Sequence, residues 1–136
     1  MKKFEIILHE AEVKIKATAL TRAGLLNIAL EGMYAAAQPQ FVEGAEGVER
    51  WFSVEAEEFD LLLIDFLCEA LNLSGTNGEA YESVSFSLIT DKKAEGTFTG
   101  RAVIGFKTQI KTASHKDLEV KKNAQDLWEA VVTFDT

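Results

Sequence analysis

The sequence is poor in the residues that support redox, disulfide or membrane chemistry. Its 136 residues include one cysteine, one proline and two histidines. Cys68 has no partner for a disulfide or a thiolate metal cage, so we expect a small buried hydrophobic side chain there. No apolar run approaches the roughly 20 residues that cross a bilayer, and the first residues turn acidic before a signal-type stretch can form. We therefore expect a cytosolic protein without membrane association.

Positive charge is also scarce, with 14 Lys and Arg against 22 Asp and Glu and a formal net charge of -8 at pH 7. Such a charge repels a phosphate backbone, whereas nucleic-acid-binding proteins present a basic patch, so direct RNA or DNA binding is not expected. The sequence also lacks a phosphate-binding glycine loop, because Gly96, Gly100 and Gly105 fall in or between predicted strands. No serine lies in a nucleophile-elbow motif, which disfavours a hydrolase triad.

The remaining composition is that of one globular domain, which we expect to cover residues 1–136. The chain is 47% apolar and 26% charged, and no repeat or linker interrupts it. Thr21 is a candidate N-cap for a helix that Pro39 stops, and a second helix is predicted over residues 59–71, before a turn-rich break at 74–78. Strands are predicted at residues 4–8, 13–19, 48–56, 84–88, 97–106, 109–113, 118–122 and 127–134. This order predicts an α+β two-layer sandwich, with two helices packed on one face of a mostly antiparallel sheet.

Acidic residues stand at both ends of the chain, each beside a predicted strand. Glu10 and Glu12 follow the first strand, with His9 able to join them, and Asp135 and the terminal carboxylate of Thr136 follow the last. Hard divalent ions prefer such oxygen ligands, so these residues form a candidate metal site if the terminal strands lie side by side. From spacing alone a solvated acidic rim is the more typical interpretation, as a hydrogen-bonded strand end is for His9.

The same end motifs occur, in the same order, in one known family. The first motif reads His-Glu-Ala-Glu-Val at residues 9–13 and the last reads Phe-Asp-Thr at residues 134–136. They resemble the His-Thr-Ala-Asp-Val motif and the Phe-Asp-aliphatic terminus of the archease family. The segments between them that resemble the family's helices and C-terminal strands are Leu25, Ala29, Gly32 and Met33, then residues 54–56, 62–67, 110–111, 118–120 and 128–130. The resemblance covers nearly the whole chain.

The resemblance implies a protein cofactor rather than a stand-alone enzyme. Archeases are thought to assist the RtcB-type tRNA-splicing ligase, which joins RNA ends bearing a 3'-phosphate or a 2',3'-cyclic phosphate, by promoting its guanylylation with GTP and its repeated turnover. Carried over to this sequence, the family's metal ligands fall on Glu12, Asp135 and the carboxylate of Thr136, and its functional lysine falls on Lys111. The implied cofactor is a divalent ion such as calcium, magnesium or manganese, and the implied partner is the ligase.

This chain departs from the family pattern beside the implied site. Glu12 stands in place of an aspartate and adds a methylene, which changes the reach or the binding mode of the carboxylate. Glu10 replaces a threonine and Lys14 replaces a glycine, so the local charge is higher. Our hypothesis is that the ion and Lys111 lie at an acidic end of the molecule that docks into a basic, phosphate-binding cleft of the ligase.

Two other functions fit the same residues. A chaperone-like binding module for an RNA-modifying enzyme would need the acidic surface but no metal. A stand-alone metal-dependent hydrolase would use the acidic cluster, although the sequence offers no clear general base for it. Lys111, judged by composition alone, is typical of a surface lysine. Neither a dimer nor a monomer is indicated.

Overall fold

The computed structural model describes residues 3–9 and 12–136 and contains two helices and eight strands. The helices are α1 (Arg22–Ala37) and α2 (Phe59–Asn77). The strands are β1 (Phe4–His9), β2 (Glu12–Ala19), β3 (Pro39–Phe41), β4 (Val48–Glu55), β5 (Glu79–Ile89), β6 (Lys93–Phe106), β7 (Thr112–Lys122) and β8 (Trp128–Asp135). The predicted α+β class is confirmed, and every strand pairing is antiparallel.

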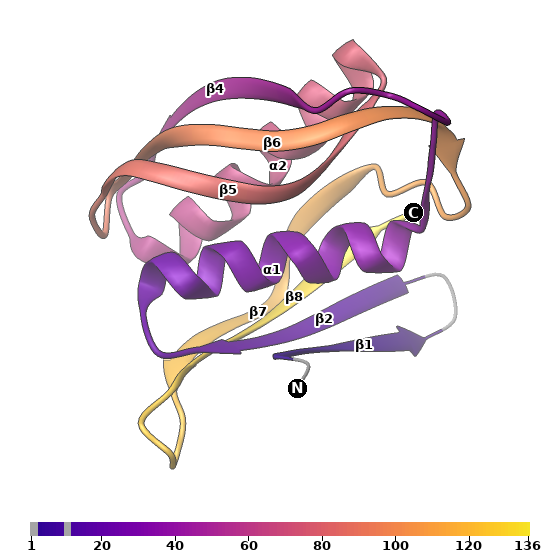
Figure 1. Ribbon diagram of the computed structural model, residues 1–136. Coiled ribbons are helices and arrows are strands. Elements are labelled where there is room, and N and C mark those ends of the chain that lie inside the picture. Colours follow the sequence, from indigo (N-terminus) through magenta and orange to yellow (C-terminus); the bar gives the residue numbers. More distant parts are fainter. Residues whose placement is uncertain (1–2, 10–11) are drawn as a thin grey trace.

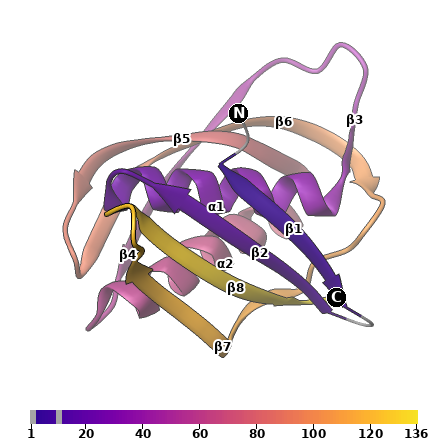
Figure 2. The same ribbon diagram turned by 90° about the horizontal axis from the view of Figure 1, so that it is seen from below.

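The strands divide between two sheets rather than forming the one sheet that the pattern suggested (Figure 1). The first, which we call the terminal sheet, has the order β1-β2-β8-β7 and joins strands from both ends of the chain. The second, which we call the middle sheet, contains β3, β4 and β5, each paired with β6. The strands at the two chain ends therefore do lie side by side, with β2 against β8 (Figure 2).

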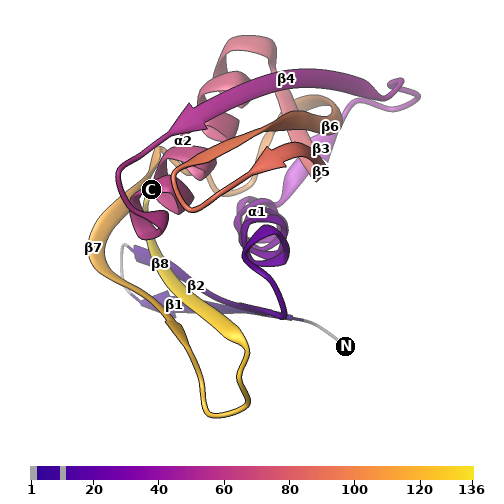
Figure 3. The same ribbon diagram turned by 90° about the vertical axis from the view of Figure 1, so that its left-hand side faces the viewer.

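Both helices lie between the two sheets, so that they cover one face of each (Figure 3). α1 contacts β2 of the terminal sheet and β5 of the middle sheet, and α2 contacts β7 and β4 in the same way. A helix enclosed on two sides needs a wide apolar surface, which explains why both helices are apolar over more than one stripe. The buried apolar residues of α2 are Leu62, Leu63, Ile64, Phe66, Leu67 and Ala70.

Local signals in the sequence agree with the ends of α1 and with the face of β2. The Thr21 side chain accepts a hydrogen bond from the Gly24 backbone at 3.0 Å, which caps the helix as predicted. The helix ends at Ala37, just before Pro39. In β2, the predicted core positions Val13, Ile15, Ala17 and Ala19 are all buried.

Three local predictions were wrong or incomplete. The turn-rich segment 74–78 continues α2 as far as Asn77, because Ser74 is buried against Tyr34 and Gly78 provides the left-handed C-cap. The predicted strands 109–113 and 118–122 are one strand, β7, with an irregular register. Cys68 is half-buried rather than buried, with its Sγ 3.4 Å from Thr112 Oγ1.

Neither helix of the described residues is long and apolar enough to cross a membrane.

Candidate functional site at one end of the terminal sheet

The predicted site residues come together at one end of the terminal sheet. Glu12 is the first residue of β2 and lies directly opposite Asp135, the last residue of β8. Asp135 is also the register partner of Thr112, the first residue of β7. Residues directly opposite in an antiparallel pair share one face of the sheet, so Glu12 and Asp135 are neighbours across more than 100 residues of sequence.

The outer face of the terminal sheet carries both carboxylates. The inner positions of β2 are buried against the helices, so Glu12 and Lys14 project from the opposite face. Asp135 is exposed there, and Phe134, its neighbour on the inner face, is fully buried. The site is therefore a surface feature at the rim of the sheet rather than a pocket in the core.

Lys111 reaches this end of the sheet through its backbone. Its N–H donates to the carbonyl of Asp135 at 2.8 Å, which holds the residue just before β7 rather than inside a strand as predicted. Its side chain is exposed and makes no ion pair within the described part of the chain. The backbone contact thus ties Lys111 to Asp135, and its ammonium group remains accessible.

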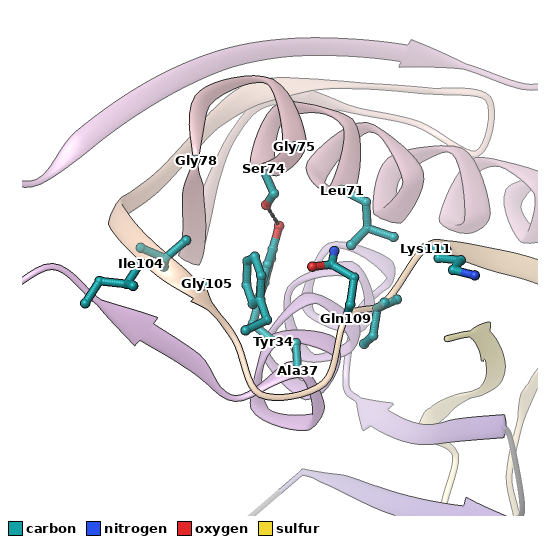
Figure 4. Close-up of a pocket in the computed structure, with 13 residues that line it drawn as sticks. Tyr34, Ala37, Leu71, Ser74, Gly75, Gly78, Ile104, Gly105, Gln109 and Lys111 are labelled. Atoms are coloured by element: carbon teal, nitrogen blue, oxygen red, sulfur yellow. Dashed lines mark hydrogen bonds between the residues drawn. The ribbon is translucent and has the colours of Figure 1, made fainter.

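Lys111 also borders a cavity of about 450 Å³ between the C-terminal ends of the two helices (Figure 4). Tyr34 and Ser74 lie at its centre, with their hydroxyl oxygens 2.5 Å apart, and Gln109 projects towards them. Burial raises the pKa of Tyr34 well above its ordinary value, so this hydroxyl is neutral. The Lys111 amine points away from these groups in Figure 4, and neither Glu12 nor Asp135 lines the cavity.

Sequence reasoning did not find Lys116, the residue in closest contact with the predicted metal ligands. Its ammonium group donates a short hydrogen bond to Glu12 Oε1. This bond lowers the pKa of the Glu12 carboxyl, and the same contact raises the pKa of Lys116, with smaller contributions from Asp117 and Asp135. No periodicity pointed to Lys116, because it lies in an irregular part of β7 whose path only the tertiary structure defines.

The groups at this rim are carboxylates, the oxygen ligands that hard divalent ions prefer. The Lys116 ammonium group is held by Glu12, and the negative charge of Asp135 also raises the pKa of Lys116, so the carboxylates at this rim attract a positive group. Within residues 3–9 and 12–136, no three His, Cys, Asp or Glu side chains form a metal-binding group, so an ion would also need the Thr136 carboxylate or water. Glu10 and the His9 side chain lie outside the described residues.

Comparison with known proteins agrees with this architecture. Residues 4–136 match the model of the archease protein family (MTH1598/TM1083). Protein 1598 of Methanobacterium thermoautotrophicum has a similar solution structure, with a TM-score of 0.69 and 21% sequence identity over 100% of both chains. The crystal structure of a Thermotoga maritima archease, a possible chaperone, has a TM-score of 0.66 and 18% identity over 97% of this chain and 96% of that one. No curated protein sequence matches this chain. Because the family model spans nearly the whole sequence, the chain belongs to the archease family.

Proposed function

We propose that this archease is a cytosolic accessory protein that activates an RtcB-type RNA ligase. In this proposal it promotes guanylylation of the ligase with GTP and so sustains repeated turnover, while the ligase carries out the joining reaction. A divalent ion, calcium, magnesium or manganese, would be held by Glu12, Asp135 and the carboxylate of Thr136. Lys111 would act beside it.

One observation supports this proposal above the others. Residues from three distant segments, Glu12, Asp135 and Lys111, meet at one rim of the terminal sheet through direct strand pairing and a backbone hydrogen bond. A solvated acidic rim needs no such convergence, since surface charges contribute little to stability wherever they lie. The arrangement is open to a macromolecular partner, and a stand-alone hydrolase would instead need an enclosed site with a general base.

The chain's own residues have separate roles in this proposal. The negative rim and the net charge of -8 favour encounter with a basic, phosphate-binding cleft of the ligase. The accessible ammonium of Lys111 can contact a phosphate oxygen, and the hydrogen bond from its backbone N–H to Asp135 keeps the Lys111 backbone beside the end of β8. A bound ion would neutralise charge on phosphate oxygens in the cleft.

The test is a multiple-turnover ligation assay with the cognate ligase, RNA ends bearing a 2',3'-cyclic phosphate, and GTP labelled at the α-phosphate. We expect Glu12→Ala, Asp135→Ala and Lys111→Ala each to lower the rate of ligase guanylylation about tenfold or more, as loss of a group acting on developing charge does. Glu119→Ala is the matched control, because Glu119 is an exposed carboxylate elsewhere in the terminal sheet. Full stimulation by the three site variants would exclude this site.

A chaperone-like binding module is the second candidate. The large apolar side chains of Leu8, Leu20 and Ile104 are each more than 70% exposed, so each is accessible to another protein. Such a module would stimulate the ligase equally well without divalent ions, and its activity would fall when these apolar residues are replaced by serine. Calorimetric titration with divalent ions separates the two candidates.

A further inference from the structure

Lys116 and Asp117 lie in the irregular part of β7, which places them over the outer face of the terminal sheet. Ser114 pairs with Thr133 and Glu119 pairs with Val131, so β7 has extra residues between these positions. Within that segment Asp117 adopts a left-handed backbone conformation with φ of 56°. Such a bulge bends a strand and redirects its side chains.

The bulge is held to β2 by two ion pairs of opposite polarity. Lys116 contacts Glu12, and the next residue, Asp117, accepts a hydrogen bond from Lys14 at 3.3 Å. Residues 12 and 14 are successive positions on one face of β2, so adjacent residues of the bulge meet adjacent positions of that face. The two ion pairs align the bulge with β2, and they place the Lys116 ammonium group at the Glu12 carboxylate.

The contact between Lys116 and Glu12 is exchangeable. The Lys116 side chain is 59% exposed and that of Glu12 is 27% exposed, so water and ions have access to both. An exposed ion pair of this kind contributes little net stability, and the flexible lysine side chain can leave the carboxylate without unfolding the strand. The pair between Lys14 and Asp117 is a separate contact between the bulge and β2, which the departure of the Lys116 side chain does not break.

We propose that Lys116 is an internal competitor for the cation-binding position at Glu12, where it occupies the carboxylate until a divalent ion displaces its ammonium group. This inference rests on the proposed function, because it concerns the regulation of the same site. An ammonium group and a hard cation both bind carboxylate oxygens, and their positive charges repel each other when both are at Glu12. Lys116 therefore raises the ion concentration that is needed to fill the site, and binding of the ion releases the Lys116 ammonium group from Glu12.

The experiment is calorimetric titration of the purified chain with Mn²⁺, in wild type and in Lys116→Met. Methionine keeps much of the length of the lysine side chain and removes its charge. We expect Lys116→Met to bind Mn²⁺ about fivefold more tightly, which is the effect of removing one competing exposed ion pair. In a Glu12→Gln background the substitution should have no effect, because the contested carboxylate is gone.

Lys121→Met is the matched control. Lys121 is an exposed lysine of the same strand, so its loss changes the net charge equally without touching Glu12. The competitor role is wrong if Lys116→Met and Lys121→Met gain Mn²⁺ affinity equally, or if Lys116→Met binds Mn²⁺ no more tightly than wild type. Neither outcome contradicts the metal site. Failure of wild type and Lys116→Met alike to bind Mn²⁺ overturns the metal site and the competitor together. Far-UV circular dichroism confirms that each variant is folded.

Discussion

At the scale of single residues, the buried carboxylate of Glu79 needs hydrogen-bond partners, because burying an unpaired charge is costly. Glu79 is 4% exposed and accepts two hydrogen bonds from Arg50, at 2.9 Å and 2.7 Å, and one from the Tyr81 hydroxyl at 2.9 Å. The Arg50 contact lowers the pKa of Glu79 despite burial, and burial raises the pKa of Tyr81 to about 12. Three hydrogen bonds reach this carboxylate, two of them from a charged guanidinium group, so removing its charge should destabilise the fold.

Glu79→Gln is expected to lower the free energy of unfolding by about 2 kcal/mol in urea denaturation, because Arg50 loses its charged partner in a partly buried place. Glu82→Gln is the control, since Glu82 pairs with Arg101 on the surface of the same sheet and should cost under about 1 kcal/mol. Similar losses for the two variants would contradict the assigned role.

The cost of Glu79→Gln should also depend on pH. The folded-state pKa of Glu79 is below its ordinary value of 4.5, so the carboxylate stabilises the fold at pH above that value. This stabilisation is lost as the pH falls from 4.5 through the lower folded-state pKa. The difference in unfolding free energy between wild type and variant should therefore be constant near neutral pH and should shrink in acid.

At the scale of secondary-structure elements, the pairing of β5 with β6 requires two glycines in β6, at positions where the β5 backbone comes very close. A Cβ atom at Gly96 would lie 2.2 Å from the Ser85 carbonyl oxygen, and one at Gly100 would lie 2.0 Å from that of Ala80. The register of β5 shifts near both positions, between Tyr81 and Ser83 and between Phe86 and Leu88. The two glycines thus permit a backbone approach that bulges in β5 create.

Gly100→Ala is expected to destabilise the protein by about 2 kcal/mol or more, because the clash is with backbone and cannot be relieved by a rotamer change. Gly105→Ala in the same strand is the control, since nothing lies within 4 Å of its added Cβ. Thermal unfolding should show a lower midpoint for the first variant only. Equal midpoints would mean that β5 and β6 separate at little cost.

At the scale of the whole molecule, the helices join the two sheets into one core. α1 packs on β2 and β5, and the Tyr34 hydroxyl of α1 contacts Ser74 of α2, so neither sheet has a core of its own. Elements that share one core unfold together. One tryptophan lies in each sheet, Trp51 in β4 and Trp128 in β8.

In Trp128→Phe the fluorescence of Trp51 should follow the same urea transition as far-UV circular dichroism, and in Trp51→Phe the fluorescence of Trp128 should do so too. Comparing two probes within each variant removes any effect of the substitution on stability. Displaced transitions in either variant would show that the terminal and middle sheets unfold as separate units.

The sequence by itself indicated the ends of α1, the buried face of β2 and the family. Alternation along residues 13–19, the Thr21 cap and the stop at Pro39 depend on near neighbours, so they can be inferred from the chain alone, and the order of the end motifs indicates an archease. Only the tertiary structure decided the register of Glu12 with Asp135, the burial of Glu79 and the bulge that brings Lys116 to Glu12. These three features depend on contacts between residues far apart in sequence, and a local sequence pattern cannot predict such contacts. The same reason explains why α2 continues past residue 74, where packing against Tyr34 outweighs the turn propensity of the segment.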